Sequence, residues 1–240
     1  MRIKALALIL IFGFGSAFAQ QMSCNDRAKK WQQLLMEYKF AEMDTLVTEG
    51  IKACSMESNF EIHHQAALTY LWRGKLDQAR PIIEKLSDRA KKNVQSSRIA
   101  TAFGPSNYLP FMLAVYSKSG EKVEEFMASY DSSIFKLQEQ ALIYLLRTGD
   151  PRFESFYLSR KQTKWEYVPI LCHVWCKRNE KATGCPCASD PLPNPAGGPY
   201  AIYKDYLSGK PMDQIKKDVE TKFAEAPYLK REVLECLGIK

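Results

Sequence analysis

Several residue types and patterns that mark catalytic or nucleic-acid-binding proteins are scarce in this sequence. It contains three histidines, His63, His64 and His173, and none stands in a recognisable metal or nucleophile motif. It has no C-x-x-C motif and no block of five or six like charges. Beyond residue 25 it has almost no alternating run of β-branched and aromatic residues, so strands are not expected. These absences favour a helical protein without a familiar catalytic centre.

The charge of the chain is nearly balanced. The 34 basic residues exceed the 27 acidic ones, and the net charge is +7. Basic and acidic residues alternate along segments such as 216–220, which is typical of a solvated helix face. We therefore expect no nucleic-acid partner. Apolar residues make up 46% of the chain, which is enough for a continuous core.

Residues 1–19 have the order of a secretory signal peptide. Arg2 and Lys4 precede the apolar run 5–15, and the small residues Ala17 and Ala19 follow. Because a helix rises 1.5 Å per residue, this run is too short to cross roughly 30 Å of hydrocarbon. We predict cleavage near Ala19 and a periplasmic or secreted protein that does not span a membrane.

Apolar residues recur at helical spacing through the rest of the chain. After Gly74 they stand three or four residues apart and face charged residues on the other side: Leu76, Ala79, Ile83, Leu86 and Ala90. Segments 134–144 and 212–223 repeat the spacing next to Gly149 and Gly209. Glycine supplies the left-handed conformation that closes a helix before a turn. The sequence therefore predicts an all-α fold.

The block 63–91 resembles the tetratricopeptide repeat. The positions that this family fills with small, aromatic, turn, small and large residues are here Ala67, Tyr70, Gly74, Ala79 and Ile83. Elsewhere the pattern fades, because the distance between successive turns changes from 35 to 46 to 29 residues. The resemblance implies a degenerate, right-handed α-solenoid of antiparallel helical hairpins, with a groove for a peptide or protein. Pro81 lies inside the second helix of this unit and is expected to bend it or delay its start.

The predicted organisation has four parts. The signal peptide 1–19 is followed by helical hairpins over 20–177 and by a loop over 178–199 that is rich in cysteine, proline and glycine. A C-terminal helical unit, 200–240, is expected to pack on the same solenoid. The loop composition excludes a regular helix or strand, and the loop is either a linker between repeats or a binding loop.

Seven cysteines in an exported chain indicate disulfides. Cys24 and Cys54 each lie fifteen residues from a turn predicted near Lys39. In an antiparallel hairpin, equal distances from the turn bring the two ends side by side. We therefore predict a Cys24–Cys54 bridge, and the alternative is two buried thiols.

Four more cysteines fall within sixteen residues: Cys172, Cys176, Cys185 and Cys187. They form either two disulfides or a tetrahedral zinc site, which His173 would join or whose thiols it would tune. The oxidising compartment favours disulfides, and a loop that turns back along the helix pairs Cys172 with Cys187 and Cys176 with Cys185. Cys236 remains as a buried thiol, unless it takes Cys172 as a partner.

The sequence therefore predicts an exported, non-catalytic scaffold or adaptor that binds a protein or peptide without a cofactor. Aromatic residues without an evident core position are the candidate contacts: Tyr108, Trp165, Tyr200 and Tyr203. His63 and His64 are expected to have packing or surface roles. The alternative function is a thiol-redox or zinc-binding protein that uses the Cys172–Cys187 cluster.

Overall fold

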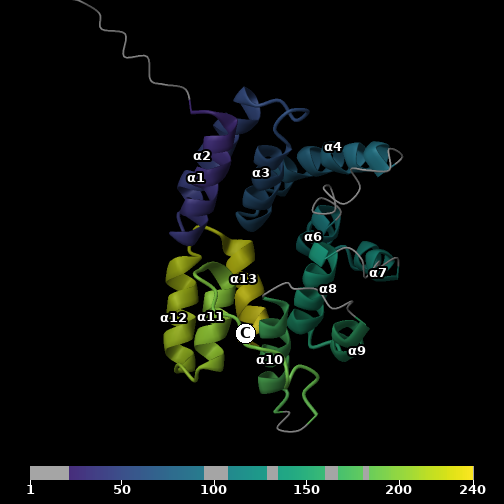
Figure 1. The fold of residues 1–240 in the computed structure, drawn as a ribbon, viewed down its shortest axis with the longest axis vertical. Coiled ribbons are helices and arrows are strands. Elements are labelled where there is room, and N and C mark those ends of the chain that lie inside the picture. The colour runs from purple at the N-terminus through teal and green to yellow at the C-terminus, as the bar shows by residue number, and fades with distance from the viewer. Residues whose placement is uncertain (1–21, 95–107, 129–134, 160–166, 181–183, 240) are drawn as a thin grey trace, which may run out of the picture.

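A computed structural model describes residues 22–94, 108–128, 135–159, 167–180 and 184–239. The predicted signal peptide and Trp165 lie outside these ranges. The described residues form twelve helices and no strand, which confirms the all-α prediction (Figure 1). The helices are α1 Cys24–Met36, α2 Phe40–Ala53, α3 Phe60–Trp72, α4 Leu76–Val94, α6 Tyr108–Tyr116, α7 Gly120–Ala128, α8 Phe135–Thr148, α9 Arg152–Ser159, α10 Val168–Arg178, α11 Gly198–Leu207, α12 Met212–Lys222 and α13 Pro227–Cys236. None of the described helices combines the length and apolarity that crossing a bilayer requires.

The first four helices have the turns that the sequence predicts. Helix α1 ends at Met36 and α2 begins at Phe40, on either side of Lys39. Between α3 and α4, Gly74 has a φ of +75° and the Lys75 amide donates to the Tyr70 carbonyl at 2.8 Å. This geometry caps the carbonyls at the end of α3 and turns the chain into α4. Helix α4 begins at Leu76, so Pro81 does not delay its start.

The residues that carry the repeat resemblance lie in the core of this region. Ala67 and Ala79 are fully buried, and their small side chains let α3 and α4 approach each other closely. Tyr70 and Ile83 are also buried, at 3% and 2% exposure. The repeat-like block is therefore one packed helical hairpin within a larger core.

The two ends of the described chain pack against each other. Phe40, at the start of α2, and Phe223, at the end of α12, are fully buried with ring centroids 6.0 Å apart. The Ala41 amide donates a hydrogen bond to Oε2 of the Glu225 carboxylate at 2.7 Å. Helix α13 also contacts α3 and α8, and Figure 1 shows the α1–α2 turn pointing towards the C-terminal helices. In an open solenoid each repeat contacts only its neighbours, so these contacts depart from the simple stack that the resemblance implies.

A buried polar network joins α6, α8 and α13. The Tyr116 hydroxyl donates to the Glu232 carboxylate at 2.8 Å, and Arg147 contacts Glu232 at 3.4 Å and Glu235 at 2.6 Å. Burial raises the pKa of Glu232 above its ordinary value, and the Arg147 charge and the Tyr116 hydrogen bond only partly offset this effect. The network satisfies polar groups that would otherwise be costly in the core.

Gly74 and Gly149 offer a matched test of the contact between the α3–α4 turn and α13. Both have positive φ, but a Cβ on Gly74 would lie 2.3 Å from the Tyr228 ring, whereas nothing lies within 4 Å of one on Gly149. We expect Gly149→Ala to lower the free energy of unfolding by about 1 kcal/mol through backbone strain alone. Gly74→Ala should cost about 1–2 kcal/mol more through overpacking. Urea unfolding of both variants measures this difference, and equal costs would contradict the contact with Tyr228.

The buried network predicts a pH dependence. Because the folded-state pKa of Glu232 is raised, the folded state binds its proton more tightly, and stability falls as pH rises from about 4.3 through the folded-state value. Glu232→Gln mimics the protonated form and escapes this loss. The variant should therefore gain stability relative to the wild type between about pH 4 and pH 7, as urea unfolding at both values would measure. A difference that does not change with pH would contradict the raised pKa.

Candidate binding groove and cysteine cluster

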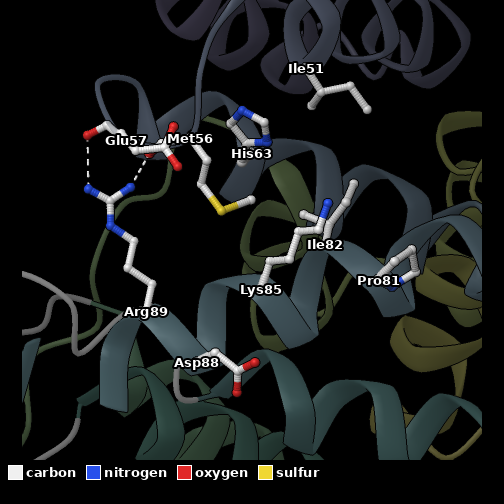
Figure 2. A pocket seen from close by; sticks show the side chains of 9 residues that line it. All are labelled: Ile51, Met56, Glu57, His63, Pro81, Ile82, Lys85, Asp88 and Arg89. Carbon is white, nitrogen blue, oxygen red and sulfur yellow. Dashed lines mark hydrogen bonds between the residues drawn. The ribbon is translucent and has the colours of Figure 1, made fainter. Parts of the chain in front are cut away.

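An open groove of about 730 Å³ lies between α2, α3 and α4. Figure 2 shows the side chains that line it: Ile51, Met56, Glu57, His63, Pro81, Ile82, Lys85, Asp88 and Arg89. They come from the end of α2, the α2–α3 turn, the start of α3 and one side of α4. The groove therefore lies between the block 63–91, which resembles a tetratricopeptide repeat, and the end of α2 with the turn that follows it.

The groove has an apolar lining with charges of both signs around it. Ile82 is 9% exposed, and Ile51 and Met56 are half-buried. Lys85 and Asp88 are exposed on α4, and Glu57 is exposed on the opposite turn. Such a surface suits a partner segment with an apolar side chain between polar groups more than a strongly charged ligand.

Specific hydrogen bonds hold the α2–α3 turn as one wall of the groove. Arg89 donates to the Met56 carbonyl and, at 2.8 Å, to the Glu57 carbonyl (Figure 2). His63 is buried, and its Nε2 lies 2.8 Å from the Cys54 carbonyl. Because a carbonyl only accepts, this contact requires the proton on Nε2. Arg89 and His63 thus shape the groove through backbone contacts.

The Cys24–Cys54 pair anchors the same wall. The structure joins the two sulfurs, with the Cα atoms 6.0 Å apart. The bridge links the first residue of α1 to the residue after α2, as the spacing about Lys39 predicts. Since His63 bonds to the carbonyl of Cys54, the disulfide and the groove wall share one residue.

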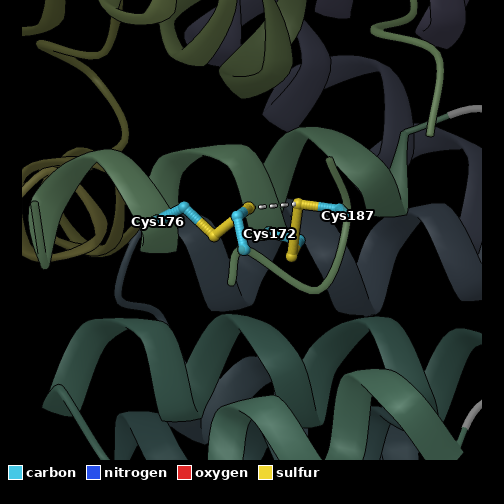
Figure 3. A group of neighbouring side chains, drawn as sticks. Cys172, Cys176 and Cys187 are labelled. Atoms are coloured by element: carbon cyan, nitrogen blue, oxygen red, sulfur yellow. Dashed lines mark hydrogen bonds between the residues drawn. A yellow bond between two sulfur atoms is a disulfide. The ribbon is translucent and has the colours of Figure 1, made fainter. Parts of the chain in front are cut away.

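The second cysteine cluster lies between α10 and the loop that follows it. Cys172 and Cys176 stand one turn apart on α10, and the chain turns back so that Cys172 pairs with Cys187 and Cys176 with Cys185 (Figure 3). These are the predicted pairs. All four sulfurs lie within 4.8 Å of one another, and those of Cys185 and Cys187 are 3.3 Å apart. Three of the cysteines are buried, and Cys185 is partly exposed.

Contacts that do not involve sulfur also hold this loop. The Tyr157 hydroxyl donates to the Asp190 carboxylate, and His173 Nε2 lies 3.3 Å from the Asp190 carbonyl. The loop is tightened by a hydrogen bond from the Asp190 amide to the Cys187 carbonyl at 2.9 Å. His173 therefore contacts the loop backbone in this structure and does not complete the sulfur cluster.

Cys236 is chemically unlike the clustered cysteines. It is a free thiol, fully buried on α13, and its Sγ lies 3.8 Å from the Ile143 carbonyl. Burial raises the pKa of this thiol to about 12. Because the thiolate is the reactive form, Cys236 is a poor nucleophile. The structure pairs Cys172 with Cys187, so the alternative pairing with Cys236 is not found.

The predicted aromatic contacts are largely interior residues. Tyr108 and Tyr203 are 3% and 1% exposed, and burial raises the pKa of both hydroxyls well above the ordinary value. Tyr200 is partly buried, stacks on Tyr167 with centroids 5.1 Å apart and donates to the Glu139 carboxylate. Their packing gives Tyr108 and Tyr203 core roles in place of the predicted partner contact.

His64 has a packing role, as the sequence analysis expects. Its Nε2 lies 2.8 Å from the Tyr108 hydroxyl, and its ring stacks against Phe60 with centroids 6.1 Å apart. His63 likewise serves packing, through the Cys54 carbonyl described above.

The groove residues Ile51, Met56 and Glu57 are not predicted from the sequence. They stand at the end of one helix and in the next turn, where no periodic pattern marks them as a surface. The sequence indicates these groove residues only indirectly. The cysteine spacing predicts that Cys54 lies at the end of a hairpin, and the repeat resemblance implies a groove.

Comparison of the chain with known proteins finds no matching family model, no similar curated protein and no similar solved structure.

Removing the Cys24–Cys54 bridge should destabilise the protein. A bridge with a sequence separation of 30 residues restricts the unfolded chain by about 3–4 kcal/mol in the chain-entropy description. We expect the double variant Cys24→Ser, Cys54→Ser to unfold at correspondingly lower urea concentration under oxidising conditions. In the presence of reductant, wild type and variant should differ much less. A variant as stable as the wild type without reductant would show that the bridge is absent from the purified protein.

Proposed function

We propose that this chain is an exported, non-catalytic scaffold of the tetratricopeptide-like kind, which binds an extended segment of a protein partner in the α2–α4 groove. One observation carries the proposal: the repeat-like block 63–91, together with the end of α2 and the α2–α3 turn, forms an open groove of about 730 Å³ with an apolar lining. That volume lies within the usual range of ligand-binding clefts, which is about 300–1,000 Å³.

The construction of the groove supports a binding role. One wall is the α2–α3 turn, which the Cys24–Cys54 bridge and the bonds from Arg89 and His63 hold in place. A wall that is ordered before the partner arrives reduces the entropy cost of binding. The exposed Lys85 and Asp88 on the opposite helix can pair with either sign of charge, so the apolar lining is expected to provide most of the affinity.

The predicted export is consistent with the same proposal. A signal peptide at residues 1–19 would direct the mature chain to an oxidising compartment, where disulfides persist. The three bridged cysteine pairs in the structure are compatible with that environment. A scaffold outside the cytosol benefits from such bridges, because the structure is then less dependent on the partner for its stability.

Two methionines provide a matched test. Met56 lies in the groove, whereas Met212 is 42% exposed at the start of α12 and lines no part of it. Peptides would first be selected from a random library for binding to the purified protein. Met56→Glu places a carboxylate against the apolar lining, so it should weaken the selected peptides at least about tenfold, or 1.4 kcal/mol. Met212→Glu should leave their affinity unchanged.

Fluorescence anisotropy with labelled peptides measures these affinities, and circular dichroism checks that both variants keep their helices. Failure to select any peptide would contradict the proposed groove. So would peptides that bind the Met56→Glu variant as tightly as the wild type.

A further inference from the structure

The four clustered cysteines lie closer together than two separate disulfides require. Each bridge alone would tie the loop to α10, yet all four sulfurs are within 4.8 Å of one another. In a tetrahedral zinc site with Zn–S bonds of 2.3 Å, neighbouring sulfurs are about 3.8 Å apart. The cluster is thus already compact enough for a single ion.

We propose that Cys172, Cys176, Cys185 and Cys187 bind one zinc ion when they are reduced. The cluster then has two chemical states, a pair of disulfides under oxidising conditions and a zinc tetrathiolate in the presence of reductant. This inference concerns α10 and its loop and does not depend on the proposed groove.

The backbone supports both states without refolding. Residues four apart on a helix share a face, so Cys172 and Cys176 approach an ion from the same side. The two cysteines of the loop, Cys185 and Cys187, directly precede and follow Pro186 in the sequence. A hydrogen bond from the Ala188 amide to the Cys185 carbonyl, at 3.1 Å, closes this turn. The Cα atoms within the two pairs are 6.1 and 5.7 Å apart. At these separations, rotation of the side chains is enough to convert the disulfides into a zinc-bound arrangement.

The chemistry begins at Cys185, the one cysteine of the cluster that is partly exposed. A thiolate of an external dithiol attacks the Cys185 sulfur, the bond to Cys176 breaks, and Cys176 leaves as a thiolate. The second thiol of the reductant then releases Cys185 and forms a disulfide within the reductant. Each bridge takes two electrons and two protons in this way. Zinc then displaces the four thiol protons and forms four Zn–S bonds.

The loop does not depend on its disulfides alone for its position. The bonds from Tyr157 and His173 to Asp190 remain when the sulfurs are reduced. They keep Cys185 and Cys187 near α10, which lowers the entropy cost of assembling four ligands around an ion. His173 is already engaged in this way, so the donor set is four sulfurs rather than three sulfurs and an imidazole.

The remaining cysteines are excluded as ligands by their positions. Cys236 is fully buried on α13, and its raised pKa opposes the thiolate form that zinc requires. Cys24 and Cys54 are paired with each other at the α1–α2 hairpin. They provide internal controls for any measurement of metal binding.

The test uses the purified protein after reduction with a water-soluble phosphine, which donates two electrons to each disulfide and is oxidised to the phosphine oxide, with water supplying the oxygen and the two thiol protons. One equivalent of zinc is added, the sample is desalted, and native mass spectrometry counts bound ions. We expect one zinc per chain. Alkylation followed by peptide mapping should show the four clustered cysteines protected until a chelator is added, whereas Cys24 and Cys54 react without one.

Matched variants assign the site. Cys185→Ser should weaken zinc binding by at least roughly 100-fold. Even the loss of a residue that only hydrogen-bonds a metal ligand lowers metal affinity about 10–100-fold. Cys24→Ser should bind zinc as the wild type does. In case Cys185→Ser fails to fold, cobalt added to the reduced wild type should show the visible bands of a tetrahedral thiolate site. No retained zinc, equal retention by Cys185→Ser, or a cobalt spectrum without thiolate bands would overturn the proposal.

Discussion

The contact between the α1–α2 turn and the C-terminal helices is the constraint on which the arrangement of the chain depends. Helix α2 has no side-chain cap at Lys39, and one of its first free amides, that of Ala41, is satisfied by Glu225, 184 residues away in sequence. Phe40 and Phe223 bury their rings next to this bond. The entropy cost of closing a loop grows only slowly with its length, so the large sequence separation adds little to the cost that this contact must offset. Without this contact, the first hairpin would expose the surface that it now buries against the C-terminal helices, including the Phe40 ring.

The groove and the four-cysteine cluster lie in two separate regions of the fold. The groove lies between the end of α2, the start of α3 and α4. The four-cysteine cluster lies on α10 and the loop that follows it. Each region has its own covalent restraint, because Cys24–Cys54 holds the groove wall and the clustered cysteines hold the loop. Replacing the clustered cysteines by substitution would therefore leave the groove wall covalently restrained.

The local features of this fold could be predicted and the long-range ones could not. The turn near Lys39, the turn at Gly74 and the proximity of Cys24 and Cys54 follow from helical periodicity and equal spacing, which act within one hairpin. Nothing in the sequence distinguishes Glu225, in the turn between α12 and α13, from other charged residues, and only the folded chain shows that it accepts a hydrogen bond from the Ala41 amide. The burial of Tyr108 and Tyr203 is not predicted for a related reason, because periodicity in one helix cannot show which neighbouring helix covers its remaining face.

The placement of the clustered cysteines is difficult to explain by stability alone. A bridge with a separation of 9 residues, such as Cys176–Cys185, contributes about 2–3 kcal/mol in the chain-entropy description. Cys172–Cys187 encloses the same segment, so the second bridge restricts a chain that is already closed and adds less than it would alone. Two bridges at separate places along the loop would restrict it more. The close approach of all four sulfurs therefore adds little stability, and it is the arrangement that the zinc ion proposed above would use.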